Sequence, residues 1–329
     1  MRIAVFSSKS YDREFLSEFN QFDNLHLQFF ETSLHPQTAA LAAGFEAVCV
    51  FVNDVLNEAV LVELQHHGVR HIALRCAGFN NVDLACANKL GITVSRVPAY
   101  SPEAVAEHTI ALILTLNRKL HKAYNRVREN NFSLRGLMGF NLHGKTVGVI
   151  GTGKIGQCVI NILHGFGCRV VCYDPYPEPR VMQQGASYVE LEELLSQSDI
   201  ISLHCPLTQQ NQHMINAHSI SKMKDKVMLV NTSRGGLIDS KAIIQGLKSA
   251  KIGAIGLDVY EMESELFFED RSDAIMQDDV FDRLSSFPNV LITGHQGFFT
   301  REALQQIAQT SLHNLYAVSQ GQRLNDTFL

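Results

Sequence analysis

The sequence predicts an α/β protein of two domains, each with a doubly wound parallel sheet covered by helices. Three observations support this. Short runs rich in β-branched residues alternate with helix-length segments along almost the whole chain. A glycine-rich turn stands between a strand-like and a helix-like segment near the middle. The length of 329 residues, with 46% hydrophobic and 19% charged residues, suits two globular domains and excludes a mostly disordered chain.

Composition also excludes some partners. Lys and Arg number 28 against 33 Asp and Glu, a formal net charge of -5, whereas nucleic acids and anionic membranes attract concentrated positive charge. The apolar stretches are shorter than the roughly 20 residues of a membrane span, and Met1 leads into a strand-like run without a signal-peptide pattern. The seven scattered cysteines favour reduced thiols. We therefore expect a cytoplasmic protein with no nucleic-acid or membrane partner.

The first hundred residues alternate between strands and helices. Glycine follows each of two helix-like segments, as is common at helix C-termini. Strand, helix and strand repeated in this way indicate parallel pairing, with helices on both faces of the sheet. The expected helices are 61–67 and 85–90, and the expected strands are 3–6, 25–30, 48–52, 71–74 and 92–94.

A helix start interrupts this alternation. In Ser101-Pro102-Glu103, the serine is a typical N-cap, the proline suits the first helical position, and the acid suits the first turn. The helix expected beyond it, 104–128, is very apolar from 110 to 116. A helix that is hydrophobic around most of its circumference should be buried on several sides, and we expect this one between domains or subunits.

A second alternating series follows. Six strand-like runs are what one doubly wound nucleotide-binding sheet needs. A helix is expected near the C-terminus, at 301–319. The expected strands are 146–150, 169–173, 200–203, 227–230, 255–257 and 290–293.

The glycine-rich turn has the spacing of a dinucleotide-binding motif. It directly follows a strand-like run, 145–150, and precedes a helix-like segment, 157–164. Gly151 allows the tight turn, Gly153 lets the backbone approach a pyrophosphate, and Gly156 lets helix and strand pack closely. The helix N-terminus then presents its N–H groups to the phosphates.

The next strand ends at Asp174, which suits recognition of the adenosine ribose. A carboxylate there accepts hydrogen bonds from ribose hydroxyls and repels a 2′-phosphate. The sequence therefore predicts NAD as the cofactor, in preference to NADP.

Three later strands are each followed by a loop with a reactive side chain, namely Arg234, Glu263 and His295. Parallel strands bring their carboxyl ends to one edge, so these groups can converge. A guanidinium binds a carboxylate bidentately, an imidazole exchanges a proton near neutral pH, and a neighbouring Glu stabilises the imidazolium. Singly, each is typical of a surface ion pair or a loop histidine. Together with the nucleotide motif, they favour a dehydrogenase site.

Further motifs occur in a fixed order along the chain, and they make the sequence resemble the D-2-hydroxyacid dehydrogenase family, most closely its bacterial fermentative D-lactate dehydrogenases. The resemblance covers essentially the whole chain. The motifs are Arg75-Cys76-Ala77-Gly78-Phe79-Asn80-Asn81-Val82-Asp83, Val97-Pro98-Ala99-Tyr100, Ala104-Val105-Ala106-Glu107-His108, the glycine turn, His204-Cys205-Pro206-Leu207-Thr208, residues 231–235, residues 258–263 and Gly294-His295-Gln296.

The resemblance implies roles for the site residues. Arg234 would anchor the substrate carboxylate and polarise the carbonyl, His295 would be the acid/base, and Glu263 would pair with His295. The Ala77-Gly78 turn would offer backbone N–H groups to the substrate. The residues implied for the cofactor are Gly151, Gly153, Lys154, Ile155 and Gly156 at the pyrophosphate, Asp174, Cys205, Pro206 and Asn211 on the adenosine side, and Thr232, Ser233, Arg234 and Asp258 toward the nicotinamide.

The family architecture implies a flavodoxin-like substrate domain, 1–99 completed by 299–329, and an inserted Rossmann NAD-binding domain, 100–298. Phe51, Tyr100 and Phe299 would then lie around the substrate side chain. Aromatic packing at the domain seam is an equally good interpretation of these rings. Large rings favour a small substrate, although one methylene changes discrimination by only ~1–3 kcal/mol.

The expected activity is reversible, NAD-dependent reduction of pyruvate to D-lactate by a homodimer or homotetramer, without a metal. Two alternatives stay open: a dehydrogenase for a larger 2-keto acid, such as phenylpyruvate or a branched-chain analogue, and an NAD(H)-sensing interaction protein. Two positions depart from the family pattern. Gly297 stands where Ala is frequent and Lys154 where Arg is frequent, and neither change removes a catalytic role.

Overall fold

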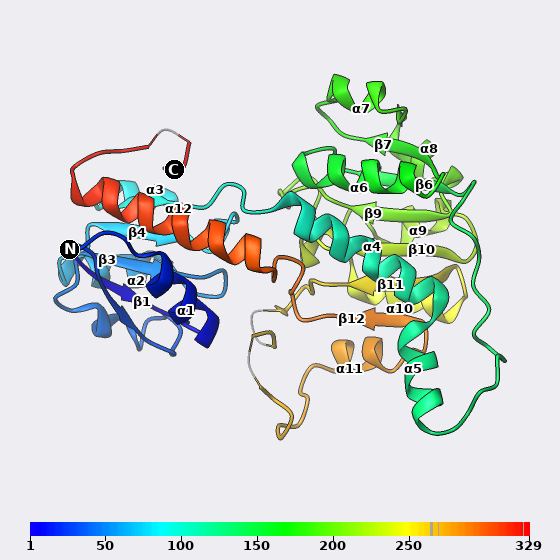
Figure 1. Ribbon diagram of the computed structural model, residues 1–329, viewed down its shortest axis with the longest axis horizontal. Coiled ribbons are helices and arrows are strands. Elements are labelled where there is room, and N and C mark those ends of the chain that lie inside the picture. The colour runs from blue at the N-terminus through cyan, green and yellow to red at the C-terminus, as the bar shows by residue number, and fades with distance from the viewer. Residues whose placement is uncertain (264–265, 269, 325) are drawn as a thin grey trace. The chain divides into compact units, whose positions relative to one another are not determined.

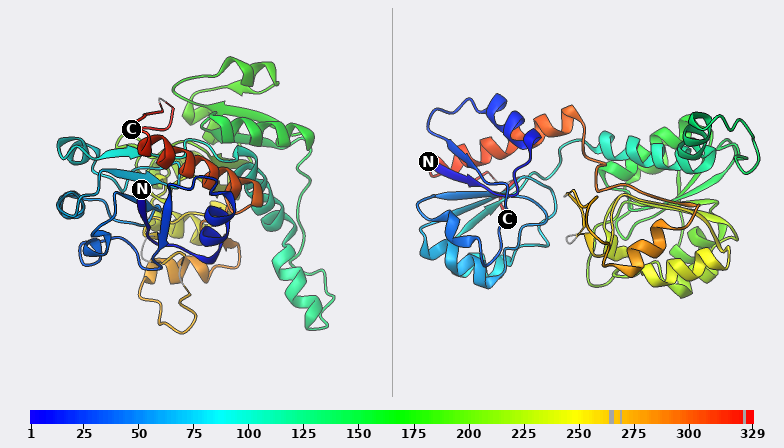
Figure 2. Two further views of the ribbon diagram at one scale, coloured as in Figure 1. Left: turned by 60° about the vertical axis from the view of Figure 1, so that its left-hand side comes forward. Right: turned by 90° about the horizontal axis from the view of Figure 1, so that it is seen from below.

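A computed structural model of the chain describes residues 1–263, 266–268, 270–324 and 326–329. The chain forms two compact units. Unit 1 is Met1–Ser101 with Phe299–Leu329, and unit 2 is Pro102–Phe298 (Figure 1). The first boundary thus lies two residues beyond the position expected from the sequence. Each unit has its own parallel sheet with helices on both faces, which confirms the predicted fold class (Figure 2).

Unit 1 has a five-stranded sheet in the order β2-β1-β3-β4-β5, and every pairing is parallel. All five strands predicted from the sequence are present. The sequence did not predict the first helix, α1, which packs against the C-terminal helix α12. The elements are β1 Arg2–Val5, α1 Ser10–Phe19, β2 His26–Phe29, η1 Ala39–Ala42, β3 Ala47–Val50, α2 Glu58–His66, β4 His71–Leu74, α3 Leu84–Lys89, β5 Thr93–Ser95 and α12 Arg301–Ser319.

Unit 2 has a seven-stranded parallel sheet in the order β12-β11-β10-β9-β6-β7-β8. The prediction of six strands was wrong by one: the additional strand, β8, has two residues and lies at the edge, too short to give a periodic pattern. The elements are α4 Pro102–Arg118, α5 Leu120–Arg128, β6 Thr146–Ile150, α6 Lys154–Gly165, β7 Arg169–Tyr173, α7 Pro179–Gln183, β8 Ser187–Tyr188, α8 Leu191–Gln197, β9 Ile200–Leu203, α9 Ala217–Lys222, β10 Val227–Asn231, η2 Gly235–Leu237, α10 Ser240–Lys248, β11 Ile252–Leu257, α11 Asp279–Ser285 and β12 Val290–Ile292.

The single long helix expected after Ser101 is two helices. Lys119, between α4 and α5, adopts a left-handed backbone conformation with φ 53°, which ends the first helix. The apolar face of α4, including Ile110 and Ile113, packs within unit 2 against α6, β10 and β11. The expectation that this apolar stretch is buried between domains or subunits was therefore wrong, because the sheet of its own unit covers it.

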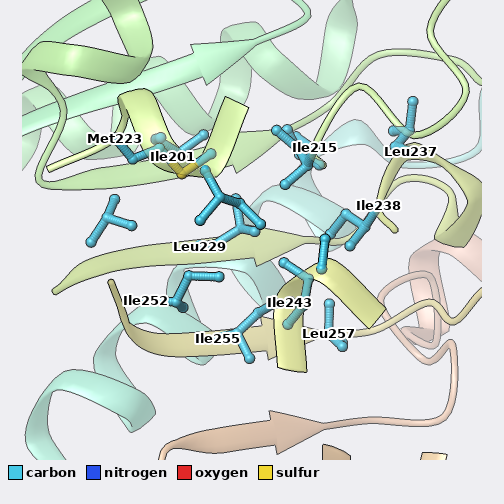
Figure 3. Packing of buried hydrophobic residues seen from close by; sticks show 14 of the residues in the cluster. Ile201, Ile215, Met223, Leu229, Leu237, Ile238, Ile243, Ile252, Ile255 and Leu257 are labelled. Carbon is cyan, nitrogen blue, oxygen red and sulfur yellow. The ribbon is translucent and has the colours of Figure 1, made fainter. Parts of the chain in front are cut away.

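Two hydrophobic clusters cover the two faces of the unit 2 sheet. Leu229 of β10 points into the cluster beneath α9 and α10, shown in Figure 3, and Val230 points into the cluster beneath α4 and α6. Full burial of such a side chain stabilises the fold by about 1.5–3 kcal/mol. This packing fixes the ends of β10, β11 and β12, whose polar loops follow directly.

Within the part of the chain that the structure describes, none of the helices combines the length and apolar character that a membrane crossing requires.

Candidate active site

The glycine turn between β6 and α6 has the shape that a pyrophosphate needs. Gly151 has φ 97°, and a Cβ there would lie 2.5 Å from the carbonyl carbon of His204. A Cβ at Gly156 would lie 2.1 Å from the carbonyl oxygen of Gly151. A Cβ at Gly153, the N-cap of α6, would meet nothing within 4 Å and would project into open space. These glycines therefore fit a phosphate group above the helix N-terminus.

Asp174 is held at the end of β7 by the glycine turn. Its Oδ2 accepts hydrogen bonds from Thr152 N over 2.7 Å and from Thr152 Oγ1 over 3.1 Å. Its Oδ1 accepts one from Tyr176 N over 2.9 Å, and the side chain stays half-buried. The carboxylate is thereby fixed beside the turn, where a ribose would lie on a dinucleotide bound there.

The loop after β9 is braced from within. Asn211 Nδ2 donates to Pro206 O and its Oδ1 accepts from Thr208 N, both over 2.7 Å. Burial raises the pKa of the Cys205 thiol to about 11. Cys205 is therefore a protonated, unreactive side chain at neutral pH.

A buried histidine precedes this loop. The Nε2 of His204 lies 2.7 Å from Ser202 Oγ, and burial lowers the pKa of the imidazole to about 4. His204 is therefore neutral and packs beneath the glycine turn. The sequence places His204 in a motif but predicts no role for it.

Arg234 follows β10 on a loop whose shape is fixed by Asn231. The Oδ1 of Asn231 accepts from Ser233 N over 3.0 Å, and its Nδ2 donates to Arg234 O over 2.8 Å. Arg234 Nη1 donates to Ser233 O over 2.7 Å, and Ser233 Oγ donates to Cys205 O over 2.6 Å. The guanidinium is half-exposed, so it keeps donors for a ligand. The motif 231–235 includes Asn231, but the sequence does not predict this bracing role.

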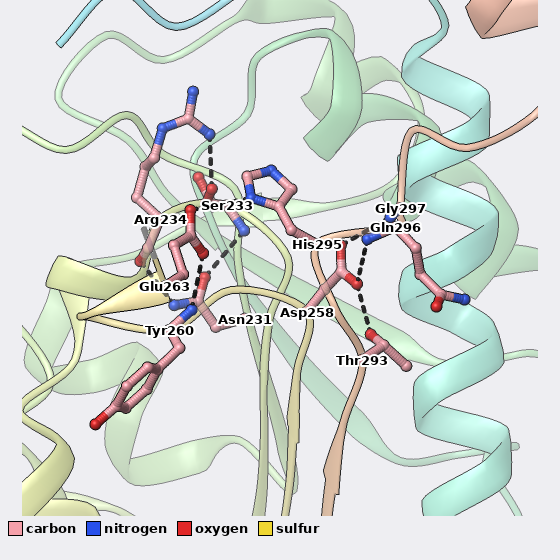
Figure 4. Close-up of polar contacts among 10 residues, drawn as sticks. All are labelled: Asn231, Ser233, Arg234, Asp258, Tyr260, Glu263, Thr293, His295, Gln296 and Gly297. Atoms are coloured by element: carbon pink, nitrogen blue, oxygen red, sulfur yellow. Dashed lines mark hydrogen bonds and ion pairs between the residues drawn. The ribbon is translucent and has the colours of Figure 1, made fainter. Parts of the chain in front are cut away.

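Glu263 and His295 form a hydrogen-bonded pair, as predicted. His295 Nδ1 lies 3.0 Å from Glu263 Oε1. The other carboxylate oxygen, Oε2, accepts from Tyr260 N over 3.0 Å, which fixes the glutamate. Since Nδ1 faces an acceptor, Nε2 is the imidazole nitrogen directed away from the pair. Figure 4 shows both side chains in the loops beyond the strand ends, with Arg234 in the loop after β10, the neighbour of β11.

Asp258 and Thr232 are buried at the same strand ends. Thr232 Oγ1 lies 2.8 Å from Thr109 Oγ1 of α4. Burial favours a raised pKa for the Asp258 carboxyl, but hydrogen bonds from His108, Thr293 and Gln296 outweigh it, so the pKa lies below its ordinary value. Asp258 is therefore a carboxylate, and all of these partners come from its own unit.

The residues expected around the substrate side chain belong to unit 1. Phe51 is buried, and its ring centroid lies 5.3 Å from Cζ of Arg75. Phe299 is half-exposed and makes an edge contact with Tyr11 at 4.9 Å between centroids. In the predicted substrate turn, Ala77 O accepts from Arg96 Nη1 over 3.0 Å and Gly78 O from Cys76 Sγ over 3.3 Å. Tyr100 is half-buried near the end of the first segment of unit 1.

The second histidine of this region is His108, which the sequence places in the motif 104–108 without predicting a role for it. It lies inside α4, yet it contacts Asp258 and Thr293. Its partners are at least 150 residues away along the chain, so local patterns do not identify them.

Comparison with known proteins agrees with this geometry. Residues 110–297 match the model of "D-isomer specific 2-hydroxyacid dehydrogenase, NAD binding domain". The chain is 56% identical over 322 residues to a D-lactate dehydrogenase of Escherichia coli, covering 98% of each. The solved apo-structure of an E. coli D-lactate dehydrogenase has a TM-score of 0.90 at 53% identity, covering 99% of each chain. The solved structure of an Aquifex aeolicus D-lactate dehydrogenase, complexed with NAD and lactic acid, has a TM-score of 0.89 at 35% sequence identity. The match covers 99% of this chain and 98% of that chain.

The family match spans more than half of the chain and the relatives span nearly all of it, which confirms both the resemblance and the prediction of NAD as cofactor. The chain belongs to the D-isomer specific 2-hydroxyacid dehydrogenase family, and its residues 110–297 match that family's NAD-binding domain.

Proposed function

We propose that the chain is an NAD-dependent D-lactate dehydrogenase that interconverts pyruvate and D-lactate. The observation that carries the proposal is the contact of 3.0 Å between His295 Nδ1, in the loop after β12, and Glu263 Oε1, in the loop after β11. β11 lies next to β10, whose loop carries Arg234. The high identity to the E. coli enzyme over the full length supports the choice of lactate among the 2-hydroxy acids.

The chemistry assigned to the chain has three parts. Arg234 binds the keto acid carboxylate with two parallel N–H donors and orients the carbonyl. His295, protonated and held through Nδ1, donates the Nε2 proton to the carbonyl oxygen during reduction and accepts it during oxidation. Glu263 stabilises the imidazolium and fixes the ring. NADH, when bound, supplies the hydride.

We assign the cofactor contacts on the same basis. The glycines and Asp174 are held in a form that fits pyrophosphate and ribose. The remaining assignments rest on the family resemblance. The proposed cofactor-binding residues are Gly151, Gly153, Lys154, Ile155, Gly156, Asp174, Cys205, Pro206, Asn211, Thr232, Ser233, Arg234 and Asp258.

Substrate contacts from unit 1 are proposed for Phe51, Ala77, Gly78, Tyr100 and Phe299. The bulk of the three aromatic rings among them favours the methyl group of pyruvate over a longer substrate side chain. A dehydrogenase for a larger 2-keto acid is the main alternative, and it would share the whole catalytic group.

An assay of NADH oxidation separates these functions. Pyruvate, 2-ketobutyrate, phenylpyruvate and oxaloacetate are compared, and the product is analysed by chiral chromatography. Fast reduction of pyruvate to D-lactate, with slower reduction of the larger acids, is the expected result. Turnover of only the larger acids would keep the mechanism and reject the substrate. Tight NADH binding without any turnover would instead favour an NAD(H)-sensing interaction protein.

We also propose that the chain is cytoplasmic and forms a homodimer. The alternative is a homotetramer, and the mass of the assembly distinguishes the two. Helix α5 buries none of its residues, and Leu120, Tyr124 and Val127 form an exposed stripe at i, i+4 and i+7. Phe132 and Leu134, in the following segment, are 71% and 82% exposed. Figure 2 shows α5 projecting from the body of unit 2. An exposed apolar surface of this kind would promote aggregation of a monomer, and a second copy of the chain would cover it.

Light scattering tests the assembly. The wild type should have at least twice the mass of one chain, and L134D with V127D should reduce it to a monomer. A monomeric wild type at micromolar concentration would reject the dimer.

A further inference from the structure

The buried carboxylate of Asp258 accepts several hydrogen bonds from the loop that carries His295. Oδ1 of Asp258, one residue beyond β11, accepts from Thr293 Oγ1 over 2.5 Å and from Gln296 N over 2.9 Å. Oδ2 accepts from Gly297 N over 2.8 Å. Figure 4 shows these bonds converging on Asp258 from both sides of His295. The position of this carboxylate therefore determines the course of the loop.

The loop has a backbone conformation that needs such support. His295 has φ 53°, in the left-handed region, which costs a non-glycine residue about 1–2 kcal/mol. Its N–H donates to the backbone oxygen of Asp258 over 2.8 Å and to Thr293 O over 3.1 Å. These bonds hold the strained residue and hence the direction in which the imidazole leaves the backbone.

A histidine of α4 also contacts this carboxylate. His108 Nε2 lies 3.2 Å from Asp258 Oδ1 and 3.1 Å from Thr293 Oγ1. Because a carboxylate only accepts, and the Thr293 hydroxyl donates to Asp258, the Nε2 of His108 must carry a proton and donate to this pair. A Cβ at Gly297 would lie 3.5 Å from His108 Cδ2, so the ring also packs against the loop backbone.

The same turn of α4 reaches the second catalytic loop. Thr109, the next residue, has its Oγ1 2.8 Å from Thr232 Oγ1, two residues before Arg234. Adjacent side chains of one helix thus contact the loop of the proposed acid/base and the loop of the proposed carboxylate anchor. Since α4 is packed on β10 and β11, it is a rigid reference for both.

We propose that His108 is a positioning residue for the reaction: through Asp258 and Thr293 it holds the His295 loop in its left-handed conformation, with the imidazole aimed at the substrate. This inference rests on the proposed function, in which His295 is the acid/base. The low pKa of the Asp258 carboxyl, to which the His108 hydrogen bond contributes, agrees with a permanently ionised partner. His108 itself exchanges no proton with the substrate in this scheme.

The test compares H108L, which keeps the volume and removes the donor, with H108Q, whose amide N–H can replace Nε2–H. Displacement of a catalytic group by about 1 Å can lower the reaction rate about 100-fold. We therefore expect H108L to lower kcat for pyruvate about 10–100-fold, with the Kd for NADH within about twofold of wild type, and H108Q to recover most of that loss. E107Q, an adjacent change of charge on α4, is the matched control and should keep kcat.

A double-variant comparison shows whether His108 acts through His295. In the H295A background, H108L should cost no further activity, because the side chain that it positions is gone. An equal loss of kcat in both backgrounds would overturn the proposal. So would full kcat in H108L. A wild type that reduces no 2-keto acid would reject the proposed function itself, before any variant is compared.

T293V tests the same contact independently, in case H108L disturbs folding. It removes the hydroxyl between His108 and Asp258 while α4 stays unchanged. The same loss of kcat with unchanged NADH affinity is expected, and a fully active T293V that melts at the wild-type temperature contradicts the proposal.

Discussion

The imidazole of His295 and the carboxylate of Glu263 are 3.0 Å apart, although 32 residues separate them along the chain. The second oxygen of the carboxylate is fixed by Tyr260 N. The glutamate therefore cannot turn away from the imidazole without losing a backbone hydrogen bond, which makes the pair a preorganised unit.

The pair predicts the effect of E263Q on turnover. The amide keeps the shape of the carboxylate but removes the charge that stabilises the imidazolium of His295. The kcat for pyruvate reduction should therefore fall by at least about 10-fold, with the Kd for NADH little changed, which steady-state kinetics and fluorescence titration measure. A wild-type kcat in E263Q would separate Glu263 from His295 function.

Replacement of Arg234 by Lys should affect binding and turnover together. Lys keeps the charge but cannot offer two parallel donors to a carboxylate, so kcat/KM for pyruvate should fall about 100–1000-fold, with a higher KM and a lower kcat. H295A is the comparison, and it should lower mainly kcat. An R234K variant with wild-type kinetics would exclude the guanidinium as the carboxylate anchor.

Two glycines of α6 form a matched pair for the cofactor turn. A Cβ at Gly156 would lie 2.1 Å from Gly151 O, whereas a Cβ at Gly165 would meet nothing within 4 Å. G156A should therefore weaken NADH binding at least 10-fold and lower the melting temperature, while G165A should keep both or raise stability by up to about 1 kcal/mol. Fluorescence titration with NADH and thermal melting measure these effects, and equal behaviour of the two variants would contradict the close packing.

Asp174 should control the choice between the two nicotinamide dinucleotides. D174N keeps an oxygen that accepts from Thr152 N but loses the charge that repels a 2′-phosphate. The preference for NADH over NADPH, as the ratio of kcat/KM values, should fall about 10–100-fold, as expected for one charged hydrogen bond. Y176F, on the same turn, is the control. An unchanged ratio in D174N would remove Asp174 from ribose recognition.

A buried histidine makes the stability of unit 1 dependent on pH. His71 lies between Thr93 Oγ1 at 2.7 Å and Ser95 Oγ at 2.9 Å, and burial, with the charge of Arg323, lowers its pKa to about 3. The unfolded chain, with a pKa near 6.5, binds the proton more readily. The stability from neutral His71 is therefore fully present above about pH 6.5 and is lost as the pH falls toward 3, with a slope of up to about 1.4 kcal/mol per pH unit.

Urea unfolding at pH 7.5, 6 and 5 measures this slope. H71Q should flatten the decline, and H26Q, at an exposed position on β2, should leave it unchanged. An equally steep decline in H71Q would assign the acid sensitivity to other groups.

By itself, the sequence determined the fold class, eleven of the twelve strands found in the described residues and the choice of three candidate site residues, because each depends on local information. Strands and helices differ in hydrophobic period. The glycine turn has fixed spacing. Arg234, Glu263 and His295 each lie in the loop that follows a strand. Parallel strands end at one edge, so order along the chain is enough to bring their loops together.

Only the tertiary structure decided the rest, because it depends on partners that are distant in sequence. The break at Lys119 and the exposure of α5 follow from what the sheet of unit 2 covers, which periodicity does not reveal. The sequence does not identify a partner for His108, because Asp258 and Thr293, which contact it in the fold, are at least 150 residues away along the chain. A buried polar group is stabilised only by the partner that satisfies it, and folding alone supplies that partner.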